Sequence, residues 1–138
     1  MARRKSKDPR VKLFTTNYDT CFEDAAGLLG ITVIDGFSFS MPRIYDARFF
    51  DMDIVRRNTT SSSTNIHYLE GVYQLYKLHG STNWSRDETS SYLIKQAENV
   101  KAEDSCMIFP AKGKYQQSYI QPHLELIARF SQSLREPN

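Results

Sequence analysis

The chain has 138 residues, within the usual range of a single domain, and its 40% apolar content with eight Phe and eight Tyr permits a hydrophobic core. Polar or charged residues interrupt every apolar run within a few positions, which excludes a signal-peptide core and a membrane span, so we expect a cytoplasmic protein. The formal charge of +2 is uneven, because the six basic residues and one acid of Met1 to Lys12 give +5 and the remainder carries −3. We expect residues 1–10 to form a basic, disordered arm, to which we assign no function.

The first expected element is a short buried strand over Val11 to Thr15. The pattern Thr20-x-x-Glu23 then predicts a capping box that opens a helix, and Gly30 suits the C-terminal cap of that helix. The apolar positions between them recur at helical spacing: Phe22, Ala25, Ala26 and Leu29. The apolar run Ile31 to Ile34 follows at once, which predicts a strand-helix-strand unit with parallel strands.

The pattern becomes irregular from Ser38 onward and ends in a run of Ser and Thr. We expect a flexible insertion at about 38–66, the least ordered interior part of the chain. Regularity returns with a strand over Tyr68 to Leu78, and a polar insertion follows Trp84 and continues through Asp104.

The remainder of the chain predicts one more strand and one more helix. Cys106 to Phe109 reads as a strand that Pro110 ends, and Lys112-Gly113-Lys114 as a turn. Pro122 fits the first turn of the final helix. One stripe of that helix holds Leu124, Ile127, Ser131 and Leu134, and Leu126, Phe130 and Ser133 lie beside it.

The two cysteines, Cys21 and Cys106, lie far apart in the sequence and do not form a Cys-x-x-Cys motif. We interpret both as reduced core thiols. Nothing between Gly80 and Asn138 can build a four-cysteine zinc module, so we expect no metal site.

The most informative feature is a pair of polar segments, each directly after an apolar run. Thr15-Thr16-Asn17-Tyr18-Asp19 follows the first strand, and Lys77-Leu78-His79-Gly80-Ser81 follows the strand that begins near Tyr68. In open α/β sheets, ligands bind in the crevice outside the carboxyl ends of the strands. We therefore expect these two segments to face one crevice.

These two segments resemble the motifs of the Sir2-like (sirtuin-related) family, which read Thr-Thr-Asn-Tyr-Asp and Leu-His-Gly in its zinc-free bacterial branch. Further landmarks of that branch occur in the expected order: Asp35-Gly36-Phe37, Trp84 and Ile108-Phe109-Pro110. The resemblance spans about residues 11 to 135. It implies an α/β, Rossmann-like three-layer fold with a mainly parallel sheet.

The chain departs from the family pattern in its glycines. The family carries a Gly-Ala-Gly-x-Ser phosphate loop before the first motif, and none of the six glycines here is spaced as a dinucleotide fingerprint. We therefore expect residues 11–138 to be a partial, incomplete Sir2-like domain. A further domain or subunit would supply the phosphate loop, and the parent protein would be an oligomer.

The resemblance implies that NAD is the substrate and that no zinc takes part. Nicotinamide leaves the ribose as a neutral molecule, so the two flanking acids of ordinary glycosidases are not needed. His79 is then the candidate catalytic base, and Asn17 would hold the ribose hydroxyls or the attacking water. The NAD-binding residues implied by the motifs are Thr15, Thr16, Asn17, Asp19 and Gly80.

Several of these residues also admit a purely structural interpretation. Asp19 suits a helix cap as well as a ligand role, and the two are compatible. His79 alone would fit a histidine hydrogen-bonded at a strand end, and only the other landmarks favour catalysis. For His123, capping or solvent exposure is a sufficient explanation, and we expect Trp84 and Tyr18 to be packing residues.

The sequence thus favours an NAD hydrolase that produces ADP-ribose and nicotinamide, with a role in antiphage defence inferred from the family. Residues 1–138 alone would be inactive or nearly so. The first alternative is a non-catalytic Sir2-like nucleotide-binding or scaffold module. The second is a nucleic-acid-binding protein that uses the basic arm, which only that arm supports.

Overall fold

The computed structural model describes residues 10–60, 63–87, 89, 93–109 and 120–135. Its centre is a parallel sheet of three strands in the order β1-β5-β2, where β1 is Val11–Thr15, β5 is Val72–Lys77 and β2 is Thr32–Ile34. All three strands were expected from the sequence, and the chain is of mixed α/β content. The strands β1 and β2 do not pair directly, however, because β5 lies between them.

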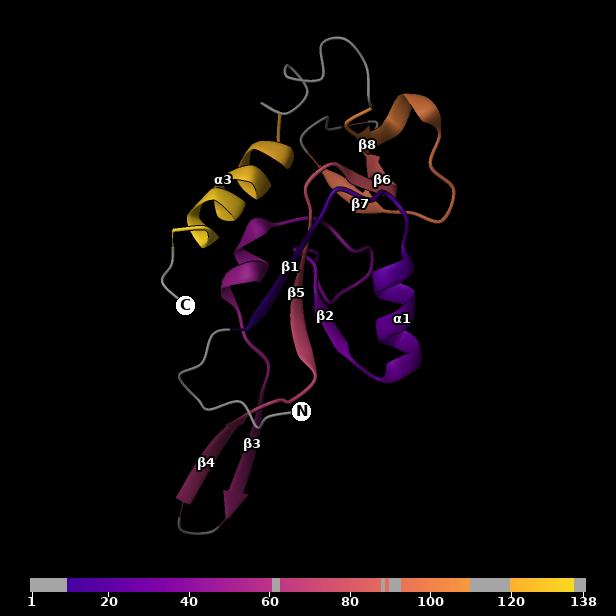
Figure 1. The fold of residues 1–138 in the computed structure, drawn as a ribbon. Coiled ribbons are helices and arrows are strands. Elements are labelled where there is room, and N and C mark those ends of the chain that lie inside the picture. Colours follow the sequence, from indigo (N-terminus) through magenta and orange to yellow (C-terminus); the bar gives the residue numbers. More distant parts are fainter. Residues whose placement is uncertain (1–9, 61–62, 88, 90–92, 110–119, 136–138) are drawn as a thin grey trace.

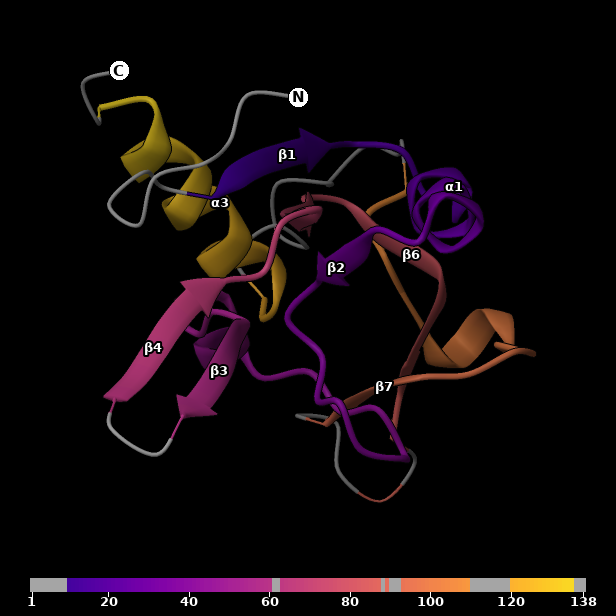
Figure 2. The same cartoon turned by 90° about the horizontal axis from the view of Figure 1, so that it is seen from below.

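The central sheet is covered on both faces (Figures 1 and 2). Alternate side chains of a strand point to opposite faces. On one face, the Tyr73 hydroxyl donates to the Phe22 carbonyl of helix α1 (Cys21–Leu29) at 3.0 Å. On the other, Tyr76 stacks on Phe50 of the 3-10 helix η1 (Ala47–Asp51), with ring centroids 4.1 Å apart. The C-terminal helix α3 (His123–Ser133) covers the same face as η1.

Helix α1 ends as the sequence predicts but begins differently. Gly30 adopts a left-handed conformation with φ +66°, and its N–H donates to the carbonyls of the last turn. The predicted capping box is wrong, because the Thr20 side chain makes no cap hydrogen bond and instead donates to Asp24 Oδ2 at 2.8 Å. The carboxylate of Asp19 accepts from the Cys21 N–H at 3.1 Å and takes the capping role.

A second sheet is antiparallel and lies beyond the carboxyl ends of β1 and β5 (Figure 1). Its order is β7-β6-β8, with β6 at Gly80–Arg86, β7 at Ile94–Gln96 and β8 at Ser105–Met107, preceded by the 3-10 helix η2 (Ala102–Asp104). Trp84 of β6 is buried between Phe37 and Tyr45, with ring centroids 5.2 and 5.9 Å away, so its packing role is confirmed. The polar insertion that we expected after Trp84 contains strand β7, so part of it has regular secondary structure.

The segment expected as a flexible insertion carries secondary structure. Phe50 of η1 belongs to the buried core. Strands β3 (Val55–Thr60) and β4 (Ser63–Tyr68) pair as an antiparallel hairpin that projects away from the sheets (Figure 1). The tip of this hairpin, residues 61–62, lies outside the described residues.

Near both ends of the chain, the structure differs in part from what the sequence predicts. Arg10 is buried and forms an ion pair with Asp53, so it belongs to the folded part, whereas residues 1–9 lie outside the described residues. The turn expected at Lys112 to Lys114 also lies outside them. Leu126 is the fully buried side chain of α3, while Leu124 is exposed. No helix within the described residues is long and apolar enough to cross a membrane.

Candidate functional site

The backbones of the two polar segments meet at one edge of the parallel sheet. Thr15 pairs with Lys77 at the ends of β1 and β5, and the Leu78 N–H donates to the Thr15 carbonyl at 2.9 Å. Asn17 and His79 each follow these paired positions by two residues. The backbones of the two segments therefore lie side by side at the carboxyl ends of β1 and β5, as the sequence predicts.

The first segment is stabilised partly by its own side chains. The hydroxyl Oγ1 of Thr15 accepts from the Asn17 N–H at 3.0 Å, and Asp19 caps α1. Hydrogen bonds from Cys21 hold the pKa of the Asp19 carboxyl below its usual value, while the same carboxylate raises the pKa of the Cys21 thiol. Asp19 is therefore an anion at neutral pH. The side chains of Thr16 and Asn17 are exposed at the strand end.

His79 lies in a two-residue turn between β5 and β6 and is half-buried. Its carbonyl accepts from the Ile108 N–H at 2.9 Å, and the Tyr18 hydroxyl donates to the Ile108 carbonyl at 2.6 Å. The rings of Tyr18 and His79 lie 6.3 Å apart between centroids. Tyr18 thus connects the first segment to the chain that holds the His79 turn.

Gly80 has a packing reason to be glycine, independent of any ligand. Its φ is +86°, in the left-handed region that side chains disfavour, and a Cβ there would overlap the Cys106 carbonyl of β8. This close approach of backbones determines where the His79 turn sits against β8. The structure does not place a ligand at Gly80, so its predicted contact with NAD stays a prediction.

Lys77 is a residue whose importance the sequence did not reveal. Its side chain is 2% exposed and contacts both polar segments and α1. Lysine is almost never fully buried unless it is paired. A short apolar run that ends in Lys gives no signal of such burial, because a lysine at a strand end is normally solvated.

His123 is also buried, which corrects the expectation of capping or solvent exposure. Its Nδ1–H donates to the Leu78 carbonyl at 3.1 Å, which leaves Nε2 as the acceptor facing Cys106 Sγ at 3.9 Å. Burial lowers the pKa of His123 to about 4 and raises the pKa of the Cys106 thiol to about 11. Through the hydrogen bond to the Leu78 carbonyl, this neutral pair supports the turn that contains His79. Cys106 is a core thiol as expected, whereas Cys21 is exposed.

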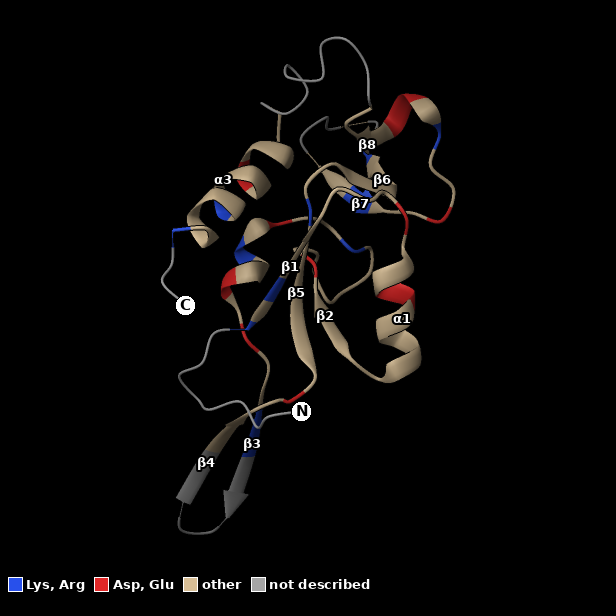
Figure 3. Ribbon diagram, viewed as in Figure 1, with Lys and Arg blue, Asp and Glu red and all other residues tan. Residues whose placement is uncertain are grey.

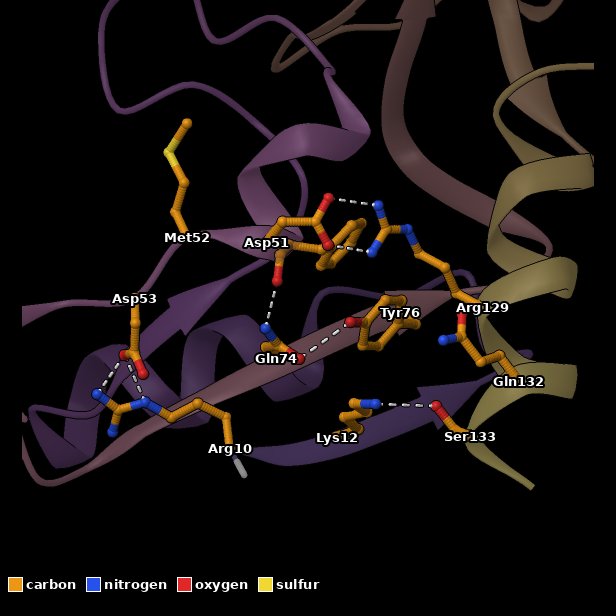
Figure 4. Close-up of a pocket in the computed structure, with 11 residues that line it drawn as sticks. Arg10, Lys12, Asp51, Met52, Asp53, Gln74, Tyr76, Arg129, Gln132 and Ser133 are labelled. Atoms are coloured by element: carbon orange, nitrogen blue, oxygen red, sulfur yellow. Dashed lines mark hydrogen bonds and ion pairs between the residues drawn. The ribbon is translucent and has the colours of Figure 1, made fainter. Parts of the chain in front are cut away.

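A pocket of about 320 Å³ lies elsewhere, between η1, α3 and the sheet face that carries Gln74 and Tyr76 (Figure 4). Two ion pairs line it, Arg129 with Asp51 at 2.7 Å and Arg10 with Asp53, and Lys12 donates to the Ser133 hydroxyl at 3.2 Å. Hydrogen bonds from the Arg129 guanidinium of α3 hold the pKa of the Asp51 carboxyl, at the end of η1, below its usual value. The Arg129–Asp51 pair joins α3 to η1, and basic and acidic residues are interspersed over these two elements (Figure 3).

The described residues contain no group of three or more His, Cys, Asp or Glu side chains arranged to hold a metal ion. The side chains gathered at the strand ends are instead an amide, a carboxylate, hydroxyls and an imidazole. These groups suit the orientation of a polar ligand and the transfer of a proton.

The sequence profile of the SIR2-like domain matches residues 11–136, which includes both polar segments and nearly the whole chain. A search of curated proteins found no match. The family match agrees with the motifs at the ends of β1 and β5 and with a mainly parallel central sheet. The chain belongs to the SIR2-like domain family.

Proposed function

We propose that the protein hydrolyses NAD to ADP-ribose and nicotinamide at the ends of β1 and β5. Membership of a family whose domains use NAD supports the substrate. The observation that carries the site is the pairing of Thr15 with Lys77, which places the Asn17 and His79 segments at one sheet edge. The anionic Asp19 lies in the same segment as Asn17.

In the proposed reaction, the bond between ribose C1′ and the nicotinamide nitrogen breaks, and its electron pair stays on the departing nitrogen. Asn17 orients the ribose or the attacking water, and the Asp19 carboxylate favours the positive charge that develops on the sugar. Water adds to C1′ and loses a proton to His79, whose imidazole is suited to this at neutral pH. Thr15, Thr16 and Gly80 line the sugar-binding side in this proposal.

The finer assignments are part of the same proposal. We place the chain in the zinc-free branch with a Rossmann-like fold, acting in the cytoplasm in antiphage defence by depleting NAD. A further segment or subunit supplies the phosphate loop, within an oligomer. In the described part of the chain β1 pairs only with β5, so its other edge has no described partner strand. This supports the addition of further structure there.

The test is NAD consumption with product analysis, on the purified full-length protein and in cells with and without phage infection. Removing a general base typically lowers the rate by about a hundredfold or more, so His79→Ala should lose activity to that extent. Asn17→Ala should also be impaired. His67→Ala and Asn99→Ala change the same residue types at exposed positions and serve as matched controls.

Two results would contradict the proposal. Unchanged turnover in His79→Ala would remove the assigned role of His79. Binding of NAD without turnover, in wild type and under infection, would favour the alternative of a non-catalytic nucleotide-binding module.

A further inference from the structure

The strongest unexplained feature outside the predicted motif side chains is the buried ammonium of Lys77. It is the last residue of β5, and its side chain is 2% exposed. A buried cation must replace all of its lost hydration with protein contacts. Its partners therefore show what the position is used for.

Those partners come from three separate elements. Nζ of Lys77 donates to the carbonyls of Tyr18 (3.4 Å) and Asp19 in the first polar segment. It also donates to the Ser81 hydroxyl at 2.7 Å, just after the His79 turn, and to Glu23 Oε1 of α1 at 3.1 Å. One ammonium thus joins the segment that carries Asn17 to the segment that carries His79.

The Tyr18 carbonyl is the point where these contacts converge. Besides Lys77, it accepts from the Ser81 hydroxyl at 3.1 Å and from the Thr82 N–H at 2.9 Å. The Tyr18 carbonyl therefore joins the first segment to the start of β6, and the Lys77 ammonium is the charged donor among its partners. A cation donating to neutral carbonyls forms stronger hydrogen bonds than a neutral donor does.

We propose that Lys77 is a positioning residue that holds the Asn17–Asp19 segment against the His79 turn and so sets the separation of the two reacting side chains. This inference rests on the proposed NAD hydrolysis. A buried ion pair is weak evidence for stability as such, because well-packed apolar residues often replace it without loss. The specific geometry of the four contacts is what an apolar residue cannot reproduce.

The main variant is Lys77→Met, which keeps the unbranched stem and removes the ammonium. On its own it leaves the Glu23 carboxylate without its cation, and Glu23 Oε2 already lacks a hydrogen-bond partner among the described residues. The second variant, Lys77→Met combined with Glu23→Gln, removes that uncompensated charge, so we expect it to fold. Lys101→Met, at an exposed position, is the matched control.

The full-length variants are compared by kcat and KM for NAD and by hydrogen exchange. Misplacing a catalytic group by about 1 Å can cost about a hundredfold in rate, so we expect the double variant to lose at least about tenfold in kcat. The Thr82 amide, which donates to the Tyr18 carbonyl, should exchange faster in it. Lys101→Met should match the wild type in both measurements.

The outcomes separate this inference from the proposed function. A folded double variant with wild-type kcat and unchanged Thr82 exchange would overturn the role of Lys77 while leaving NAD hydrolysis in place. A wild-type protein that consumes no NAD would overturn both. Loss of kcat together with faster Thr82 exchange, in a variant as stable as the wild type, supports the inference.

Discussion

Mild acid should destabilise the protein through His123, which supports the His79 turn. His123 is 2% exposed, and desolvation, with smaller contributions from the charges of Arg86 and His79, lowers its pKa to about 4 from 6.5 in the unfolded chain. Between these values the unfolded chain binds a proton that the folded protein does not. The free energy of unfolding is therefore highest above pH 6.5 and falls as the pH drops toward 4.

The size of this loss follows from the two pKa values. Between pH 7 and pH 5, a pKa of 6.5 in the unfolded chain and about 4 in the folded protein reduces the free energy of unfolding by about 2 kcal/mol. Carboxylates with lowered pKa, such as Asp51, lose their contribution at lower pH, below their unfolded value of 3.8. The window from pH 7 to pH 5 therefore reports mainly on histidine.

The assay is urea unfolding of wild type and His123→Asn at pH 7 and pH 5. Asparagine keeps a donor where Nδ1 contacts the Leu78 carbonyl but does not titrate. Comparing the two pH values within each protein cancels the packing cost of the substitution. The wild type should lose about 2 kcal/mol more than His123→Asn. His67→Asn, at an exposed position, should behave as the wild type does. Equal losses in wild type and His123→Asn would refute the reasoning.

Two further predictions follow from the same strand ends. Gly80→Ala should lower the free energy of unfolding by more than about 2 kcal/mol, because the added Cβ overlaps the Cys106 carbonyl. Gly30→Ala, which has open space around its Cβ, should lower it by only about 1 kcal/mol. Equal losses for the two variants in urea unfolding would contradict this prediction. Iodoacetamide should modify exposed Cys21 and spare buried Cys106 in the native protein, and Asp19→Asn should speed the reaction at Cys21 by lowering the pKa of its thiol. Peptide mass spectrometry measures both rates, and an unchanged rate at Cys21 in Asp19→Asn would count against the Asp19–Cys21 contact.

The sequence predicts the parallel sheet well, because its strands are apolar and the connections of α1 to β1 and β2 are short. Val11–Thr15 and Val72–Lys77 read as strands, and Gly30 marks the end of α1. Strand order could not be read in the same way, since β5 reaches the centre of the sheet only after a long excursion. Local periodicity carries no information about which strands pair across such a distance.

The elements that the sequence missed are polar ones. The β3–β4 hairpin has a Ser- and Thr-rich sequence in which apolar and polar residues do not alternate, so the pattern that marks a strand is absent from it. Strands β6 and β7 each contain one large buried apolar residue, Trp84 and Ile94, and their other residues are polar or glycine.

The sequence likewise predicts some residues of the candidate site and misses others. Asn17, Asp19 and His79 were found because they follow apolar runs in a recognisable order. Lys77 and His123 were not, since lysine is usually exposed and histidine is intermediate in burial, and only the folded chain shows that both are buried here. Their burial is a property of contacts between distant segments.

The central claim is that the Asn17 carboxamide and the His79 imidazole face one sugar-binding site. The most direct measurement is a crystal structure of the full-length His79→Ala variant with NAD bound, because loss of the base preserves the substrate. We predict that the nicotinamide ribose lies within hydrogen-bond distance of Asn17 and beside position 79. Ribose bound at another edge of the sheet, or residues 17 and 79 directed to opposite sides of the molecule, would contradict the account.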